Sequence, residues 1–248
     1  MNEQWEEIRP FVEDMACVKK DGKYGFINEQ GELVSPCQWD DAGDFDDGVA
    51  WVKKGDLFGV INTEGKVLTP CQWDEVFVWN NGFVEVKKQG KSGCVDISGT
   101  LVVPCEWESV VPELSGYFEV FKDNKFGLMN GQGELIIPCI WDYVGNEFYE
   151  GHVLVENNDK VGLVDETGKL VIPCEWDGIN FHFYGGRTEV IKDGMHGIVD
   201  NKGQVLVPCK WNWVQRWEDG TAEFGNDLEI YKLDKDGNII QLPNYWSR

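Results

Sequence analysis

The chain is poor in positive charge. Its 248 residues include 44 Asp and Glu but only 22 Lys and Arg, which gives a formal net charge of −22. Nucleic acids and anionic membranes are held largely by Lys and Arg side chains that displace counterions. We therefore expect neither a nucleic acid nor a membrane as a partner, and we expect most of the acidity to serve solubility.

Long hydrophobic runs are also missing. No stretch of 18 apolar residues occurs, so no segment is predicted to span a membrane. The segment from Met1 to Glu7 has neither the basic nor the apolar region of a secretory signal. Together these absences predict a cytoplasmic protein.

Motifs of catalysis and metal binding are absent as well. There are three histidines, His152, His182 and His196, and the eight cysteines form no C-x-x-C pair. The chain has no nucleophile elbow, no metalloprotease motif, no phosphate loop and no dinucleotide fingerprint. We therefore predict that the protein is not an enzyme, with no catalytic residue, no metal and no cofactor. The cysteines are expected to be reduced, partly buried apolar residues.

What the chain does have is tryptophan at a fixed interval of 34 or 35 residues. The series is Trp5, Trp39, Trp73, Trp107, Trp141, Trp176, Trp211 and Trp246. Six of these close a Pro-Cys-x-Trp phrase, such as Pro36-Cys37-Gln38-Trp39. A fixed period of this length indicates stacked structural repeats. We predict one repeat domain over residues 1–248, with units at approximately 5–38, 39–72, 73–106, 107–140, 141–175, 176–210 and 211–246.

Each unit reads as three strands. In the second unit, residues 49–54, 58–62 and 66–69 are rich in β-branched and aromatic residues and are separated by Gly, Asn and Asp. Pro70 lacks an N–H, so it is expected to end the third strand. Asn62 and Gly65 mark a turn that recurs in all seven units. A second recurring glycine, Gly59 in this unit, indicates a bulge or a close backbone approach, and we expect it to let neighbouring units pack tightly.

The predicted class is therefore all-β. No segment shows a helical period, and seven three-stranded β-meander units of ~34 residues favour an open β-solenoid or superhelix. The alternative is a closed, seven-bladed propeller-like ring. The open form is preferred because propeller blades usually have four strands in about 40 residues or more.

The repeat resembles the bacterial WG β-repeat (KWG repeat) family. The resemblance rests on Lys23-Tyr24-Gly25-Phe26-Ile27-Asn28, on Gly31 to Pro36, and on Trp39-Asp40, and it recurs along nearly the whole chain. It implies an all-β array with no shared enzymatic activity. The tryptophan that precedes glycine in the family is replaced here by Tyr24, Phe58, Ser92, Phe126, Val161 and His196. Tryptophan stands instead in the Pro-Cys-x-Trp phrase.

Recognition is expected in the segments that follow each repeated tryptophan, since these change from unit to unit and loops on a rigid scaffold often carry function. They contain aromatic residues of the kind enriched at interfaces. The predicted binding residues are Phe77, Trp79, Tyr149, His182, Tyr184, Trp213 and Trp217. The leading hypothesis is a binding scaffold for a protein or peptide.

The repeated tryptophans are expected to build the framework by packing one unit on the next. This set comprises Trp39, Trp73, Trp107, Trp141, Trp176 and Trp211. The alternative function uses the same residues as an exposed aromatic ladder, which would make the protein a carbohydrate-binding module.

Overall fold

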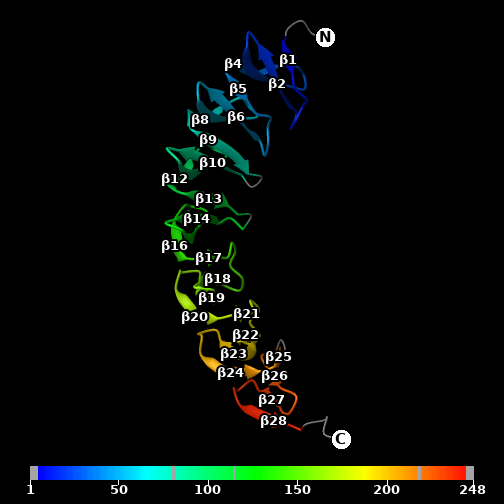
Figure 1. Cartoon of the computed structure of the whole chain (residues 1–248). Coiled ribbons are helices and arrows are strands. Elements are labelled where there is room, and N and C mark those ends of the chain that lie inside the picture. Colours follow the sequence, from blue (N-terminus) through cyan, green and yellow to red (C-terminus); the bar gives the residue numbers. More distant parts are fainter. Residues whose placement is uncertain (1–4, 80–81, 114, 217–218, 244–248) are drawn as a thin grey trace. The chain divides into compact units, whose positions relative to one another are not determined.

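A computed structural model describes residues 5–79, 82–113, 115–216 and 219–243. In these residues every regular element is a β-strand, and the strands form seven antiparallel sheets of four strands each (Figure 1). Neighbours in the chain are neighbours in each sheet, and none of the described sheets closes on itself. Among the described residues, no helix is long and apolar enough to cross a membrane.

The strands of the first four sheets are short and evenly spaced. Sheet 1 contains β1 (Glu7–Ile8), β2 (Met15–Lys20), β3 (Lys23–Asn28) and β4 (Leu33–Trp39). Sheet 2 contains β5 (Asp41–Ala42), β6 (Val49–Lys54), β7 (Leu57–Asn62) and β8 (Val67–Trp73). Sheet 3 contains β9 (Glu75–Trp79), β10 (Phe83–Lys88), β11 (Lys91–Asp96) and β12 (Leu101–Trp107). Sheet 4 contains β13 (Ser109–Pro112), β14 (Phe118–Lys122), β15 (Lys125–Met129) and β16 (Leu135–Trp141).

The last three sheets repeat the same order. Sheet 5 contains β17 (Tyr143–Val144), β18 (His152–Asn157), β19 (Lys160–Asp165) and β20 (Leu170–Trp176). Sheet 6 contains β21 (Gly178–Ile179), β22 (Arg187–Lys192), β23 (Met195–Asp200) and β24 (Val205–Trp211). Sheet 7 contains β25 (Trp213–Arg216), β26 (Ala222–Gly225), β27 (Ile230–Leu233) and β28 (Ile239–Leu242).

The chain divides into two compact parts. The N-terminal part comprises residues 1–124 and 128–135, and includes sheets 1 to 3. The C-terminal part comprises residues 125–127 and 136–248, and includes sheets 5 to 7. Sheet 4 contributes residues to both.

The expectation of three strands per unit is wrong, because each sheet has four. The extra strand lies in the segment after the repeated tryptophan, which the sequence predicted to be a loop. In sheet 2 it is β5, whose two residues pair with β6 through Asp41↔Lys53 and Ala42↔Val52. Two residues are too few to show the alternation of a strand. Their conformation is decided by the neighbouring strand.

The expectation that proline ends the last strand is also wrong. Strand β8 continues through Pro70 to Trp73, and it does so by bulging. Between the pairs Phe58↔Trp73 and Val60↔Thr69, β8 contains extra residues that its partner β7 lacks. A bulge leaves backbone groups out of the ladder, so the missing N–H of proline costs no hydrogen bond there.

The second recurring glycine makes this bulge possible. A Cβ on Gly59 would lie 2.7 Å from the oxygen of Thr69 and 2.9 Å from the nitrogen of Cys71, which both belong to the same sheet. The predicted close backbone approach is therefore confirmed, but the approach is within a unit and not between units. In sheet 7 Tyr231 occupies the corresponding position, and β27 and β28 pair without a register shift.

Neighbouring units meet at the other glycine, in the turn before the last strand. The turn forms as predicted: in sheet 2 the Asn62 Oδ1 accepts hydrogen bonds from the N–H groups of Glu64 and Lys66, and Gly65 has a φ of 75°. A Cβ on Gly65 would overlap the carbonyl oxygen of Val34 in sheet 1. The backbones of successive units are therefore in direct contact in the N-terminal part.

The core lies between successive sheets, and the repeated tryptophans fill it. Trp39 shares a buried cluster with Ala50, Val52 and Ile61 of the next sheet. The corresponding indoles are 4–8% exposed at Trp39, Trp73, Trp141, Trp176 and Trp211, and Trp107 is half-buried. Because replacing a buried tryptophan by alanine costs about 3–5 kcal/mol, one indole per unit is a large share of the stability.

The hydrogen bonding of the indole N–H differs between the units. Trp73 Nε1 donates a hydrogen bond of 2.7 Å to Thr69 Oγ1, and Trp39 Nε1 donates one of 3.2 Å to Ser35. An aliphatic residue stands at the matching place in later units, such as Val207 before Trp211. Among the described residues, the buried indole N–H has no partner in Trp107, Trp141, Trp176 and Trp211. Apolar packing therefore outweighs an unmade hydrogen bond in those units.

The outer faces of the first and last sheets differ. Residues Ala16, Val18 and Ile27 of sheet 1 form a buried cluster against which Trp5 packs. In sheet 7, Glu223 pairs with Lys232 at positions where sheet 1 has Cys17 and Phe26. The outward face of sheet 7 is therefore more polar at these two positions than the same face of sheet 1.

The contact at Gly65 gives a matched pair of substitutions. Gly31 occupies the same turn position with a φ of 80°, but its Cβ would have no heavy atom within 4 Å. We expect Gly31→Ala to cost only the strain of a left-handed residue, about 1–2 kcal/mol. Gly65→Ala should cost about 1–3 kcal/mol more, because it also forces two backbones apart. Urea unfolding followed by circular dichroism measures both; equal midpoints would contradict the assigned contact.

Candidate functional site

Two of the predicted binding residues lie on β9 in the N-terminal part. The ring of Phe77 is 46% exposed, but the ammonium of Lys87 lies 5.0 Å from its centroid. Trp79 stands opposite Phe83, and its buried indole N–H has no partner among the described residues. The ring of Phe77 is therefore in contact with a cation of the same chain, and the indole of Trp79 is packed within its sheet.

Three further predicted residues are brought together in the C-terminal part. The hydroxyl of Tyr149 lies 3.0 Å from His182 Nδ1, and the two rings meet edge to face at 4.8 Å. The centroid of Tyr184 lies 6.3 Å from that of His182. These residues come from the segments 142–151 and 177–186, which follow two successive repeated tryptophans. The tertiary structure thus makes one cluster from residues 33 to 35 positions apart.

The remaining two predicted residues do not add to this cluster. Trp213 begins β25 and packs over Gly225, where a Cβ would lie 3.2 Å from Cζ2 of the indole. No ring contact described in the structure joins Trp213 to Tyr149, His182 or Tyr184. Trp217 lies outside the described residues.

A hollow of about 290 Å³ lies beside Tyr149 and His182. It is lined by Tyr143, Gly145, Asn146, Glu147, Tyr149, His152, Leu154, Phe181 and His182. Three of these rings are large and exposed to solvent, at 45% for Tyr143, 40% for Tyr149 and 45% for Phe181. A concave surface with aromatic walls and a few polar groups is the usual form of a ligand site.

The sequence analysis did not select Tyr143, Glu147, His152 or Phe181 as binding residues. Tyr143 is the first residue of the unpredicted strand β17, and its exposure depends on that strand's pairing with β18. The imidazole of His152 stacks on the ring of Phe183, with 5.1 Å between the two centroids. The only available signal was that Tyr143 and Phe181 are aromatic and lie in segments that vary between units.

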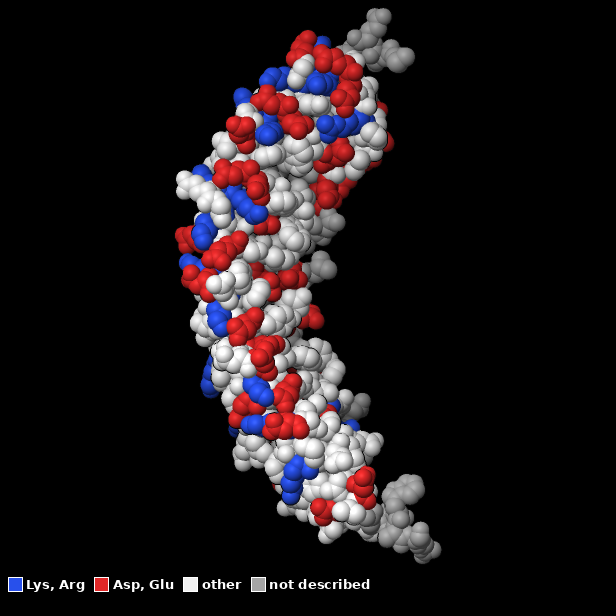
Figure 2. All heavy atoms as spheres, in the orientation of Figure 1, with Lys and Arg blue, Asp and Glu red and all other residues white. Residues whose placement is uncertain are grey.

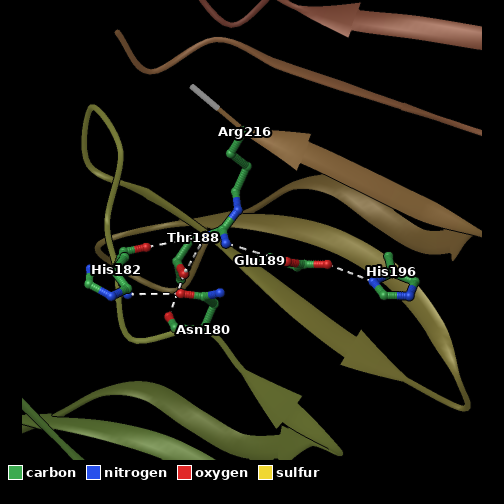
Figure 3. A network of polar contacts seen from close by, with 6 residues as sticks. All are labelled: Asn180, His182, Thr188, Glu189, His196 and Arg216. Carbon is green, nitrogen blue, oxygen red and sulfur yellow. Dashed lines mark hydrogen bonds and ion pairs between the residues drawn. The ribbon is translucent and has the colours of Figure 1, made fainter. Parts of the chain in front are cut away.

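The wall that contains His182 is held by a polar network from sheet 6 and the following sheet (Figure 3). Arg216 on β25 donates a hydrogen bond of 3.2 Å to the carbonyl oxygen of His182, and its guanidinium lies 5.2 Å from the centroid of Tyr184. Arg216 Nη2 lies 3.4 Å from Glu189 Oε2, and Glu189 Oε1 lies 2.6 Å from His196 Nδ1.

The same loop is fixed from within. Asn180 Oδ1 accepts a hydrogen bond of 3.0 Å from the His182 N–H, and Thr188 donates one of 2.5 Å to the Asn180 carbonyl oxygen. Glu150 Oε2 accepts one of 3.0 Å from the N–H of Phe183, which ties the two variable segments together. The aromatic wall is therefore positioned before any ligand arrives, which lowers the entropic cost of binding.

Both variable segments of the hollow begin at an anchored carboxylate. Asp142 accepts a hydrogen bond of 2.5 Å from Lys125 Nζ and one of 2.8 Å from the N–H of Asn158. These two bonds, the lysine first, hold the pKa of Asp142 below its usual value. Asp177 repeats the arrangement with Lys160 and the N–H of Asp193, and its pKa is lowered in the same way.

A second hollow, of about 390 Å³, lies in the N-terminal part. It is lined by framework residues such as Pro70, Trp73 and Leu101, and by Lys88, whose ammonium lies 5.7 Å from the Trp73 centroid. Its residues belong to the repeated framework and not to the variable segments. It therefore lacks the feature that distinguishes the aromatic hollow of the C-terminal part.

The cysteines are poorly suited to covalent chemistry. Burial raises the pKa of the Cys17 thiol to about 11 and that of the Cys94 thiol to about 12. Burial also raises the pKa of five thiols of the repeated phrase, those of Cys37, Cys71, Cys105, Cys174 and Cys209. Cys71 Sγ lies 3.7 Å from the Val52 carbonyl oxygen. At neutral pH these groups are thiols and not the nucleophilic thiolate.

Comparison with known proteins identifies the repeat. The family model of the WG containing repeat matches residues 4–24, 24–58, 58–91, 93–126, 126–160, 162–195 and 197–227. No curated protein matches the chain significantly.

Several solved structures show a low similarity. A eukaryotic initiation factor is 11% identical, over 92% of this chain and 74% of its own, with a TM-score of 0.35. Hsv2 of Kluyveromyces lactis is 11% identical over 94% of both chains, with a TM-score of 0.29. PorZ of Porphyromonas gingivalis is 7% identical, over 98% of this chain and 38% of its own, with a TM-score of 0.30. TM-scores this low carry no argument about fold or function.

The anchored carboxylates lead to a pH-dependent effect. Because the folded-state pKa of Asp142 is lowered from 3.8, its ionised form stabilises the fold above that pH, and this contribution is lost as the pH falls below it. We expect Asp142→Asn to lower the thermal midpoint at pH 7, with a difference from wild type that shrinks towards pH 3. The control is Glu166→Gln, which changes an exposed carboxylate that makes no described contact. A difference that persists unchanged at pH 3 would show that the anchor is not electrostatic.

Proposed function

The chain belongs to the WG-repeat family, and from that premise we propose that it is a non-enzymatic cytoplasmic scaffold that binds a protein or peptide. The binding surface in this proposal is the aromatic hollow of the C-terminal part, formed by the variable segments 142–151 and 177–186. Neither a nucleic acid nor a membrane is the proposed partner, because the net charge of −22 opposes both.

One observation carries the proposal: the chain buries its repeated aromatic residues and exposes irregular ones around a preformed hollow. Trp141 and Trp176 are 8% and 4% exposed, whereas Tyr143 and Phe181, which lie shortly after them in the sequence, are both 45% exposed. Exposed large aromatic side chains lose apolar contact with water when a partner covers them, and they are enriched in binding hot spots. The hydrogen bonds around His182 hold the surface in one conformation.

The carbohydrate alternative has less support. It needs the repeated tryptophans to present their ring faces to solvent, but Trp39, Trp73 and Trp211 are only 5–6% exposed. A sugar cannot stack on a ring that is already covered by the next sheet. The same burial supports their proposed role as framework residues.

The architecture we propose is the open array, with the closed seven-bladed ring as the alternative. The number of strands no longer separates the two, since each unit has the four strands of a propeller blade. The support comes from the outer faces: Trp5 packs against the apolar face of sheet 1, and sheet 7 presents Glu223 and Lys232. Ring closure would place those charges in a core position, where the desolvation of two charged groups is costly even when they pair.

Small-angle X-ray scattering tests the open array. We expect a pair-distance distribution with a long tail, as an extended particle gives. A symmetric distribution typical of a disc of the same mass would favour the ring. The variant Glu223→Val/Lys232→Val provides a second readout, because an apolar outer face should promote self-association that size-exclusion chromatography detects.

The binding function is tested by affinity capture with matched variants. The bait variant Tyr149→Ala/Phe181→Ala removes two exposed rings of the hollow. Its control, Phe11→Ala, removes a ring that is 46% exposed in the N-terminal part and is not a predicted binding residue. We expect at least one protein captured by the wild type and by the control to be lost with the double variant. For that protein, calorimetry with purified components should show an affinity loss of about tenfold or more. If no partner distinguishes the baits, the proposed surface is wrong.

A further inference from the structure

We propose that the aromatic hollow of the C-terminal part receives the side chain of an arginine or lysine from the bound peptide. This inference rests on the proposed peptide-binding function and specifies the chemistry of its ligand. It follows from three properties of the hollow: its size, its charge and its uncovered rings.

The size suits one side chain. Pockets that enclose drug-sized ligands have about 300–1,000 Å³, so a volume of about 290 Å³ lies at the lower limit. Leu154 and the rings of Tyr143, Tyr149 and Phe181 offer apolar contact to a methylene stem. Arg and Lys stems pack along apolar surfaces in this way while the charged head meets polar groups.

The charge of the lining is negative. Glu147 is the one carboxylate among the lining residues, and none of them is Lys or Arg. The other nearby carboxylate, Glu150, already accepts a hydrogen bond from the Phe183 N–H. Glu147 makes no described hydrogen bond or ion pair, so its oxygens are available to a guanidinium or an ammonium.

The net charge of the whole chain is also negative. Acidic side chains outnumber basic ones two to one, at 44 against 22, and the two kinds are interspersed over the face drawn in Figure 2. An acidic protein attracts cationic ligands and repels anionic ones, and the effect weakens with salt. A basic peptide is therefore favoured over an acidic one before any contact is made.

The exposed rings of the hollow have no described cation of the same chain beside them. Elsewhere in the described structure, Lys or Arg side chains of the same chain lie 4.8–6.0 Å from the centroids of Trp5, Tyr24, Phe58, Trp73, Phe77, Trp107, Trp176, Tyr184 and Trp211. No such partner is described for Tyr143, Tyr149 or Phe181, although all three are exposed. Cation–π attraction from these rings is thus available to a ligand.

One further acceptor is fixed by the backbone. His152 Nδ1 lies 2.9 Å from the carbonyl oxygen of Glu150, which can only accept, so that nitrogen carries the proton. In the neutral imidazole this leaves Nε2 as an acceptor. With Glu147 it gives the lining two groups able to receive N–H donors, of which a guanidinium has five.

The test selects peptides from a random library displayed on phage, with the full chain as target. Selected sequences are then synthesised in pairs, one with Arg and one with citrulline, which keeps the shape of arginine but is neutral. For lysine the neutral counterpart is acetyl-lysine. Affinities are measured for wild type, Glu147→Gln, Tyr149→Ala, Phe181→Ala and the control Phe11→Ala.

We expect the selected peptides to share one basic position, and its neutral counterpart to bind about tenfold more weakly. Each ring truncation should weaken binding by about two- to fivefold, the size of one exposed cation–π contact. Glu147→Gln should reduce the preference for arginine over citrulline, because the variant and the neutral ligand remove the same interaction. Phe11→Ala should leave every affinity unchanged.

The failures of the two proposals are distinguishable. Peptides that need the hollow but contain no basic residue would overturn the assignment of a basic side chain to the hollow. They would leave the proposed peptide binding in place. A preference for arginine that Glu147→Gln does not change would likewise overturn the assignment. If no peptide is enriched, or if all bind independently of Tyr149 and Phe181, the proposed function fails together with this inference.

Discussion

The structure depends on the packing of one indole per unit against the next sheet. A four-stranded sheet of 2- to 7-residue strands buries little apolar surface by itself. Trp39 and Trp211 each supply a large apolar surface to the neighbouring sheet, as seen in the clusters with Ala50 and Val52 and with Ala222 and Phe224. This contact is strong enough that later units retain it even though the indole N–H is buried without a partner.

Two other repeated features serve that packing. The bulge over Gly59 lets the last strand of the sheet pass through proline and still present Trp73 at its end. The turn glycine Gly65 then lets the next unit touch the backbone at Val34. Each feature removes a steric obstacle, so each needs glycine, and both recur with the period of tryptophan.

The segments between these fixed points are free to vary, and the candidate site arises from two of them. Their ends are anchored by Asp142 and Asp177, and their aromatic residues are held by Arg216 and Asn180. Since the framework does not need these side chains, they can be selected for recognition. The proposed binding surface is therefore held in place without belonging to the core.

The residue pattern alone predicts the all-β class, the repeat, its family, the turn at Asn62 and Gly65, and the close approach at Gly59. These follow from local rules, because period, β-branched content and glycine in special conformations act over a few residues. It missed the fourth strand and the passage of β8 through Pro70, because both depend on pairing with a partner strand. It selected Tyr149, His182 and Tyr184 but not Tyr143 or Phe181. Which rings remain exposed and line one hollow could not be predicted from the residues, because exposure depends on which neighbouring sheet covers each side chain.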